Sequence, residues 1–220
     1  MKYSVVVLVF HRTHELVQMA KDCIASIKNN SEDYELIIVD NGSSEGDPLY
    51  WQEQADVYVR LDENRGIAPA WNIGLKLARG KYIAVCNDDI LVGKGWLEKM
   101  SAAHELPQAG ATALQVQNLP QDIGVVDTKR WLPGSCFMLK PKTIEKVGYF
   151  DERFFPAQFE DVDYWHRMFE AGLKYYVDHS FTIQHKESQT LKSPDIGGHY
   201  EANKKLFIEK WGFDPIPRYY

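Results

Sequence analysis

The feature that most limits the folds open to this chain is the alternation of strand and helix patterns along its first half. Residues 4–9 form a continuous apolar and β-branched run, typical of a strand buried on both faces. Thr13 then offers an N-cap to a helix whose apolar residues repeat at helical spacing until Asn29-Asn30-Ser31. The pattern continues with strands at 35–39, 56–60 and 81–86 and helices at about 69–79 and 95–105. This alternation predicts an α/β fold with a Rossmann-like, mostly parallel central sheet flanked by helices.

The rhythm changes after about residue 107, where the elements become shorter and less regular. Residues 115–131 are polar and irregular, and the strongest later signal is a helix over 159–171 closed by Gly172. Weaker patterns predict strands at 134–139, 175–177 and 181–184 and helices at 142–147 and 200–211. A chain of 220 residues suits one sizeable α/β domain, and it shows no internal repeat and no clean linker. We therefore predict a single domain over residues 1–220 with a smaller C-terminal half.

Composition and charge restrict the class of protein further. Apolar residues make up 45% and charged residues 25% of the chain, which is the balance of a soluble globular protein. No segment approaches the roughly 20 apolar residues that span a bilayer. The net charge of -6 argues against a nucleic-acid-binding surface, which usually carries a basic excess. Cys23, Cys86 and Cys136 show no metal or redox spacing, so we predict reduced thiols and a cytoplasmic location.

Polar side chains gather where three of the predicted strands end. The clusters are His11-Arg12, Asp40-Asn41 and Asn87-Asp88-Asp89. In parallel sheets, ligands bind outside the carboxyl ends of the strands. The topology alone therefore predicts a ligand site at this edge of the sheet.

The adjacent carboxylates of Asp88 and Asp89 need a cationic partner to offset their repulsion. Hard divalent cations such as Mg²⁺ or Mn²⁺ bind one or two carboxylates together with substrate phosphates. The alternative is a plain acidic turn, since Asn and Asp favour turns.

The segment 64–74 combines a glycine, a cation and a helix start. Gly66 allows close approach of the backbone to a ligand, and the N–H groups of the helix that follows suit a phosphate. Arg65 adds a fork-shaped cation. The alternative is an ordinary capped helix with Asn72 and Gly74 packed against the sheet.

Three acids begin the helix at 159–171, namely Glu160, Asp161 and Asp163. The helix dipole favours acids there, and Asp161 could be a simple N-cap. The functional reading makes one carboxylate a general base that accepts a proton from a hydroxyl. His185 follows a short apolar strand, where a histidine is structural unless Asp89 and a diphosphate lie opposite it.

Taken together, these segments resemble the family-2 inverting glycosyltransferases with the GT-A fold. The resemblance spans about residues 4 to 188 and rests on the order and spacing of its motifs. These are residues 5–10, 36–43, 64–74, Asn87-Asp88-Asp89, 134–139, 148–152, Glu160-Asp161-Val162-Asp163 and His185.

The resemblance implies roles for individual residues. Asp161 matches the general base and Glu160 its acceptor-positioning neighbour, while Asp89 and His185 match metal ligands. Asp40 resembles the acid that contacts the nucleotide base, next to backbone near 10–12. The donor-binding set that it implies is Phe10, His11, Arg12, Asp40, Asn64, Arg65, Asn72, Asn87 and Asp88. One departure is Asn87, which stands where the first acid of the DXD motif is expected.

The resemblance also implies a reaction. A sugar is expected to move from a nucleotide-diphosphate sugar to an acceptor hydroxyl with inversion, assisted by Mn²⁺ or Mg²⁺. UDP is the default nucleotide, and the acceptor is a saccharide, with modified nucleic acid or protein as alternatives. Residues 1–106 would bind the nucleotide sugar, residues 107–190 the acceptor, and residues 191–220 would form a tail or lid. The sequence leaves the oligomeric state open.

Three rival functions remain at this stage. A dinucleotide-dependent oxidoreductase should carry Gly-x-Gly-x-x-Gly after the first strand, where this chain has residues 11–15, His-Arg-Thr-His-Glu. A sugar nucleotidyltransferase normally has a Gly-rich, Arg-containing loop there, which is also absent. A catalytically degenerate binding module is disfavoured by the presence of Asp40, Asp89, Asp161 and His185.

Overall fold

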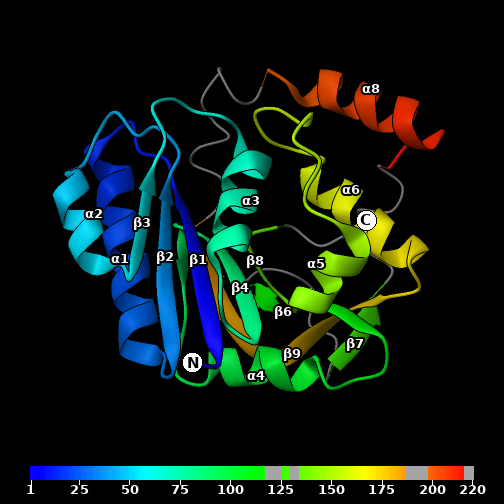
Figure 1. The fold of residues 1–220 in the computed structure, drawn as a ribbon, viewed down its shortest axis with the longest axis horizontal. Coiled ribbons are helices and arrows are strands. Elements are labelled where there is room, and N and C mark those ends of the chain that lie inside the picture. Colours follow the sequence, from blue (N-terminus) through cyan, green and yellow to red (C-terminus); the bar gives the residue numbers. More distant parts are fainter. Residues whose placement is uncertain (117–124, 129–133, 187–197, 216–220) are drawn as a thin grey trace.

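The computed structural model describes residues 1–116, 125–128, 134–186 and 198–215, and these form one mixed sheet with helices on both faces (Figure 1). The strands are β1 (Tyr3–Val9), β2 (Tyr34–Asp40), β3 (Val57–Arg60), β4 (Tyr82–Asn87), β5 (Ile90–Leu91), β6 (Ala109–Val116), β7 (Val125–Thr128), β8 (Cys136–Leu139) and β9 (Lys174–His185). The helices are α1 (His14–Asn30), α2 (Pro48–Gln54), α3 (Ile67–Leu77), α4 (Trp96–Ala103), α5 (Pro141–Val147), α6 (Glu160–Glu170) and α8 (Tyr200–Trp211).

The strand order is β3-β2-β1-β4-β8-β6-β9-β5, with β7 paired to β9. Strands β3, β2, β1 and β4 are parallel to one another, and β6 is parallel to β9. Strand β8 runs antiparallel between β4 and β6, so the two parallel groups point the same way. The predicted α/β fold with a mostly parallel central sheet is confirmed.

The apolar run of β1 is explained by burial on both faces of the sheet. All seven residues of β1 are buried. Val5, Val7 and Val9 face the core formed with α1 and α4, whereas Val6 and Leu8 face the core formed with α3 and α6. A strand between two helical layers has no solvent face, so it lacks the polar alternation of a half-exposed strand.

Helix α1 begins where its sequence signals predict. The hydroxyl of Thr13 accepts a hydrogen bond from the backbone N–H of Leu16 at 3.3 Å, which is the N-cap contact. Helix α3 instead begins after Gly66, whose φ of +90° suits glycine. The described helices include none that is both long and apolar enough to cross a membrane.

The structure differs from the sequence prediction at β6, β7, β9 and α2. Strands β6 and β7 occupy parts of a segment for which no strand was predicted. The two short strands predicted at 175–177 and 181–184 are one strand, β9. Its polar residues Asp178 to Ser180 fall where the register between β6 and β9 shifts, so they interrupt the apolar pattern without ending the strand. Helix α2 was not predicted.

The C-terminal region contains one described helix, α8, with the predicted limits. It packs on α6 through aromatic side chains, including His166 against Trp211 with ring centroids 4.3 Å apart (Figure 1). Of the lid predicted over 191–220, residues 191–197 and 216–220 lie outside the described residues.

Candidate functional site

The end of β4 carries the first acidic pair, and a buried histidine faces one member. His11 follows β1 and is fully buried, and its Nε2 lies 2.9 Å from Asp88 Oδ2. The imidazole also packs beside the Trp51 ring, with centroids 5.3 Å apart. Burial raises the pKa of Asp88, and the hydrogen bond with His11 opposes that shift. The His11 side chain therefore positions Asp88, although only the backbone around residues 10–12 was predicted to contribute here.

The second acid of this pair faces another histidine from the far end of the chain. Strands β5 and β9 pair Ile90 with His185, which brings His185 Nε2 to 3.1 Å from Asp89 Oδ1. Asp89 is largely buried, and its Oδ1 accepts no hydrogen bond from the described residues. The backbone N–H of Lys186 donates to the Asp89 carbonyl at 2.9 Å and fixes this corner. The predicted metal ligands Asp89 and His185 are thus brought together.

A carboxylate oxygen and an imidazole nitrogen that lie 3.1 Å apart suit a shared cation. The described residues contain no cluster of three or more His, Cys, Asp or Glu that could hold a metal ion. Mg²⁺ and Mn²⁺ commonly take one or two protein ligands and complete their coordination with substrate phosphates and water. Asp89 and His185 therefore fit a divalent cation that is bound jointly with a diphosphate.

Asp40 lies at the end of β2 and is locked in place. Its Oδ1 accepts the backbone N–H of Ser43 at 2.8 Å, and its Oδ2 accepts the Tyr58 hydroxyl at 3.0 Å. The Arg60 guanidinium lies 3.6 Å from Oδ2. Burial, followed by the charge of Asp40, raises the pKa of Tyr58 to about 12, so the phenol remains a donor. These contacts hold Asp40 as a fixed acceptor at the floor of the site.

Side-chain amides join the turn after β2 to the segment before α3. Asn41 Nδ2 donates to Asn64 Oδ1 at 2.9 Å, and Asn41 Oδ1 accepts the backbone N–H of Arg65 at 2.9 Å. Gly42 has φ of +82°, and a Cβ there would lie 2.5 Å from the Glu63 carbonyl carbon. Only glycine permits this approach. The predicted residues Asn64 and Arg65 are thereby fixed beside Asp40, with the Arg65 side chain exposed.

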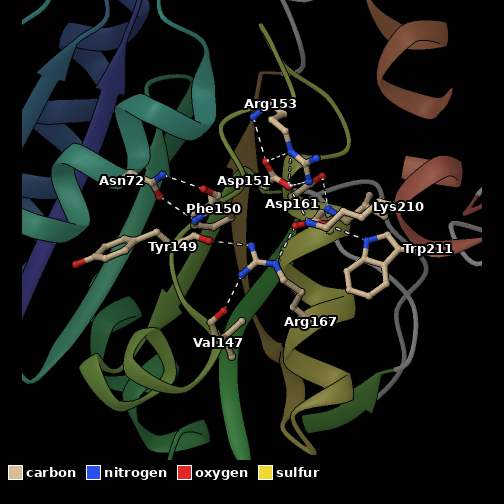
Figure 2. Close-up of polar contacts among 12 residues, drawn as sticks. Asn72, Val147, Tyr149, Phe150, Asp151, Arg153, Asp161, Arg167, Lys210 and Trp211 are labelled. Atoms are coloured by element: carbon tan, nitrogen blue, oxygen red, sulfur yellow. Dashed lines mark hydrogen bonds and ion pairs between the residues drawn. The ribbon is translucent and has the colours of Figure 1, made fainter. Parts of the chain in front are cut away.

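Three further residues predicted to bind the donor are Phe10, Arg12 and Asn72. Phe10 is partly buried. Arg12 is exposed and its guanidinium lies 5.1 Å from the Phe10 ring centroid. Asn72 is buried, and the hydrogen bonds of its amide go to a segment other than the acidic pairs. Its Nδ2 donates to the Phe150 carbonyl and to Glu152 Oε1, both at 2.9 Å, and its Oδ1 accepts the Phe150 N–H (Figure 2). A contact between Asn72 and the donor stays a prediction.

The second acidic pair begins α6 and differs from a simple helix cap. Phe159 is the N-cap residue, with a left-handed φ of +73°, so Asp161 lies inside the helix. Asp161 Oδ2 accepts the backbone N–H of Gly134 at 3.0 Å, and Oδ1 accepts that of Val162 at 2.8 Å. Glu160 is 4% exposed, and its Oε2 has no hydrogen-bond partner among the described residues. Burial and then the charge of Asp161 raise the pKa of Glu160 well above its usual value.

Gly134 and Ser135 connect the two acidic pairs. The Ser135 carbonyl accepts the backbone N–H of Asn87 at 2.8 Å, while the Gly134 N–H donates to Asp161. A Cβ on Gly134 would lie 2.6 Å from the Trp71 ring and 3.3 Å from Asp161 Cβ. A larger residue would therefore push the carboxylate away. One dipeptide thus sets the position of α6 relative to the end of β4.

Tyr58 and Arg60 contribute to this site but were missed as site residues in the sequence. They alternate along β3, so both point to the same face, and β3 pairs with β2 in register at Asp40 and Arg60. The spacing of two residues was a usable signal, but it required the pairing of β3 with β2 to be known. The Gly134 N–H was also missed, because no pattern of side chains indicates a backbone donor.

Comparison with known proteins relates these features to a family. Residues 4–171 match the family described as Glycosyl transferase family 2. An N-acetylglucosaminyl-diphospho-decaprenol L-rhamnosyltransferase of Mycobacterium tuberculosis is 38% identical over 76 residues, 34% of this chain and 24% of that protein. A pre-mycofactocin glycosyltransferase of the same organism is 23% identical over 182 residues, 71% of this chain and 38% of that protein. The matched parts thus span about a quarter to two fifths of these relatives' length.

Two solved structures share the fold. The crystal structure of GalNAc-T7 with UDP, GalNAc and Mn²⁺ aligns with a TM-score of 0.73 at 14% identity, covering 96% of this chain and 49% of that one. The crystal structure of S. aureus TarS 1-349 aligns with a TM-score of 0.65 at 14% identity, covering 97% of this chain and 74% of that one. At such identities the likeness concerns the fold alone.

Proposed function

The chain belongs to glycosyl transferase family 2, and we propose that it moves a sugar from a nucleotide-diphosphate sugar to an acceptor hydroxyl with inversion at the anomeric carbon. The observation that carries the proposal is the link through Gly134-Ser135. It holds Asp161 at a set position relative to the end of β4, where Asp88 and Asp89 lie. A base and a diphosphate site must be fixed relative to each other for an in-line displacement.

The donor would lie across the ends of β1, β2 and β4. Asp40, held by Ser43 and Tyr58, is a fixed acceptor for an N–H on the nucleotide base. Asp88, held by His11, would accept a hydroxyl of the ribose or of the donor sugar. We propose a UDP-sugar, because a structural neighbour was crystallised with UDP and because Asp40 offers only acceptor oxygens to the base.

Asp89 and His185 would hold Mn²⁺ or Mg²⁺ together with the donor diphosphate. The support is the distance of 3.1 Å between His185 Nε2 and Asp89 Oδ1, the burial of Asp89, and the Mn²⁺ in the structural neighbour's crystal. When bound, such a cation neutralises the charge that grows on the departing phosphate oxygen.

Asp161 would act as general base in the displacement. Its carboxylate is oriented by the N–H groups of Gly134 and Val162, and a carboxylate fixed in this way can accept the proton of an acceptor hydroxyl. As the acceptor oxygen forms its bond to the anomeric carbon, its proton passes to Asp161 and the bond to the diphosphate breaks. Burial and the charge of Asp161 raise the pKa of Glu160 well above its usual value, which favours the protonated form, and this form would donate a hydrogen bond that positions the acceptor.

We propose a saccharide acceptor and a cytoplasmic location. The first rests on a relative named for rhamnosyl transfer to an N-acetylglucosaminyl-diphospho-lipid, a sugar-bearing acceptor. The second rests on three buried cysteines that are all free thiols, including Cys86 and Cys136 with Sγ atoms 3.7 Å apart.

The experiment is a thermal-shift panel of nucleotides and nucleotide sugars, each with Mn²⁺, with Mg²⁺ and with chelator. Ligands that bind only the native state raise its stability by mass action. We expect UDP and UDP-sugars to stabilise the protein in the presence of metal, and the stabilising sugar then to be transferred to a saccharide. Modified nucleic acid and protein acceptors form further arms of that assay. Absence of any shift would favour a degenerate binding module, and pyrophosphate release from a nucleotide triphosphate and a sugar phosphate would favour a nucleotidyltransferase.

A further inference from the structure

Helix α8 lies beyond the part of the chain that matches the family and yet contacts the segment that leads into α6. Asn203, in its first turn, is almost fully buried. Its Nδ2 donates to three backbone carbonyls, those of Phe155 at 3.1 Å, Ala157 at 2.8 Å and Gln158 at 3.2 Å. A buried amide is costly unless it is hydrogen-bonded, so these contacts define where the segment lies.

The segment held by Asn203 requires external support. Gln158 and Phe159 have left-handed φ angles of +77° and +73°, which residues other than glycine rarely adopt. These two residues directly precede Glu160. On its other side, the Pro156 carbonyl accepts the backbone N–H of Ile67 at 2.8 Å, at the start of α3. The segment thus lies between α8, the donor-side loop and the first turn of the helix that carries Glu160 and Asp161.

The far end of α8 holds the same first turn through charge. Lys210 Nζ lies 2.6 Å from Asp163 Oδ1 and 2.7 Å from Asp151 Oδ2 (Figure 2). Trp211 Nε1 donates to Asp163 Oδ1 at 2.9 Å, and Arg167 Nε donates to Asp163 Oδ2 at 2.9 Å. The Asp163 side chain is fully buried. Both carboxylate oxygens of Asp163 therefore have hydrogen-bond or ion-pair partners, and the partners of Oδ1 come from α8.

These polar contacts are more specific than docking of a helix requires. Phe207 already packs in the core beside Phe159, with ring centroids 6.2 Å apart. Buried ion pairs add little net stability compared with apolar contacts, but they impose one geometry. In α8, Asn203 is directed at the backbone that leads to Gln158, two residues before Glu160, and Lys210 is directed at Asp163, two residues after Asp161.

We propose that Asn203 and Lys210 are positioning residues for the transfer reaction, holding the left-handed turn and the first turn of α6 so that Glu160 and Asp161 face the donor. The inference rests on the proposed function. Neither residue touches the reacting atoms. A misplacement of about 1 Å can cost about 100-fold in rate, so contacts of this kind affect catalysis without contributing to chemistry.

The test compares Lys210→Met and Asn203→Leu with three matched variants. Lys210→Arg keeps the charge, Lys205→Met removes an exposed lysine from the same helix, and Ile27→Ala destabilises α1 on the opposite face of the sheet. For each variant, the affinity for UDP with Mn²⁺ and the turnover of the donor sugar are measured well below the unfolding transition. The melting temperature is measured separately.

We expect Lys210→Met and Asn203→Leu to lose about 10- to 100-fold in kcat while their UDP affinity stays close to the parent value. Lys210→Arg should recover most of the rate, and Ile27→Ala should lower the melting temperature while keeping kcat. Parental kcat in both test variants, or a rate loss in Ile27→Ala equal to theirs, would overturn the positioning role and leave the proposed function standing. A parent protein that turns over no nucleotide sugar would overturn both.

Discussion

Asp88-Asp89 at the end of β4 and Glu160-Asp161 at the start of α6 are both adjacent acids, but their surroundings differ. Each acid of the first pair faces an imidazole, from His11 and from His185. In the second pair, Asp161 accepts backbone N–H groups, and the pKa of Glu160 is raised by burial and by the charge of Asp161. The first pair is suited to bind a cation through Asp89, and the second is suited to hold and exchange a proton.

The cations near the second pair are directed at a third acid in the first turn of α6. Lys210 and Arg167, together with the Trp211 indole, contact Asp163. Asp163 is thereby a structural acid of the helix. The difference shows that acids close in sequence can be assigned opposite tasks by what packs on them.

The largest expected effect comes from removing the proposed base. Asp161→Ala should lower the transfer rate by about 10²–10⁴-fold while UDP binding with Mn²⁺ remains, because a positioned base acts only in the chemical step. The measurement is turnover at saturating donor, with Glu53→Ala on the exposed face of α2 as the control. A rate near that of the parent would show that both acidic pairs serve binding.

The next effect concerns the first pair. Asp89→Ala should abolish the part of UDP binding that depends on Mn²⁺, because a carboxylate ligand is lost. At a ligand concentration of 100 Kd the parent gains about 2.7 kcal/mol of stability, and the variant should lose most of this gain. Calorimetry that finds the same donor affinity with and without Mn²⁺ in the parent would exclude the metal role of Asp89.

A smaller effect separates the two histidines. His185→Gln should weaken Mn²⁺ binding by at least about 10-fold, since even residues behind the ligands cost that much when they are lost. His11→Gln should leave Mn²⁺ affinity close to the parent value and weaken UDP binding instead, because His11 contacts Asp88. Titration of Mn²⁺ in the presence of UDP measures both constants. Equal losses in the two variants would mean that the imidazoles do not have separate roles.

The smallest effect is a pH dependence of stability. Because the folded pKa of Glu160 is raised above its usual value of 4.5, the folded state keeps a proton that the unfolded chain releases. Stability should therefore fall as pH rises above about 4.5, by up to about 1.4 kcal/mol per pH unit until the folded pKa is reached. Glu160→Gln should remove this slope, with little difference from the parent at pH 4 and a growing gain above it. Urea unfolding at several pH values tests this, and a constant difference would contradict it.

Local sequence patterns predicted the strands and helices whose apolar residues recur at regular spacing. Strand β1 and helix α1 were recognised because their apolar patterns are strong, whereas β6 was missed because its sequence is rich in Ala and Gly, which are depleted in strands. Strand β6 exists because β8 and β9 flank it. That stabilisation comes from tertiary pairing and is invisible in a local window.

Some residues of the candidate site could likewise be predicted from the sequence, and others could not. Asp89, Asp161 and His185 could be proposed from motif order, and the structure brings Asp89 and His185 together through β5 and β9. Asn203 and Lys210 could not be proposed, because polar residues in a helix ordinarily lie in solvent. Only the position of α8 against residues 155–163 reveals that they contact this segment.

The pairing of Ile90 with His185 also sets an order of events during synthesis. Ribosomes add about 5–20 residues per second, so His185 is made roughly 5–20 s after Asp89. A nascent chain can bring His11 to Asp88 as soon as β1 and β4 meet, since both residues belong to the first half. Asp89 can contact the imidazole of His185 only after β9 has been synthesised. The growing protein should therefore form the contact between His11 and Asp88 in the proposed nucleotide site before the proposed cation site of Asp89 and His185, an order that pulse-labelled, length-arrested chains would resolve.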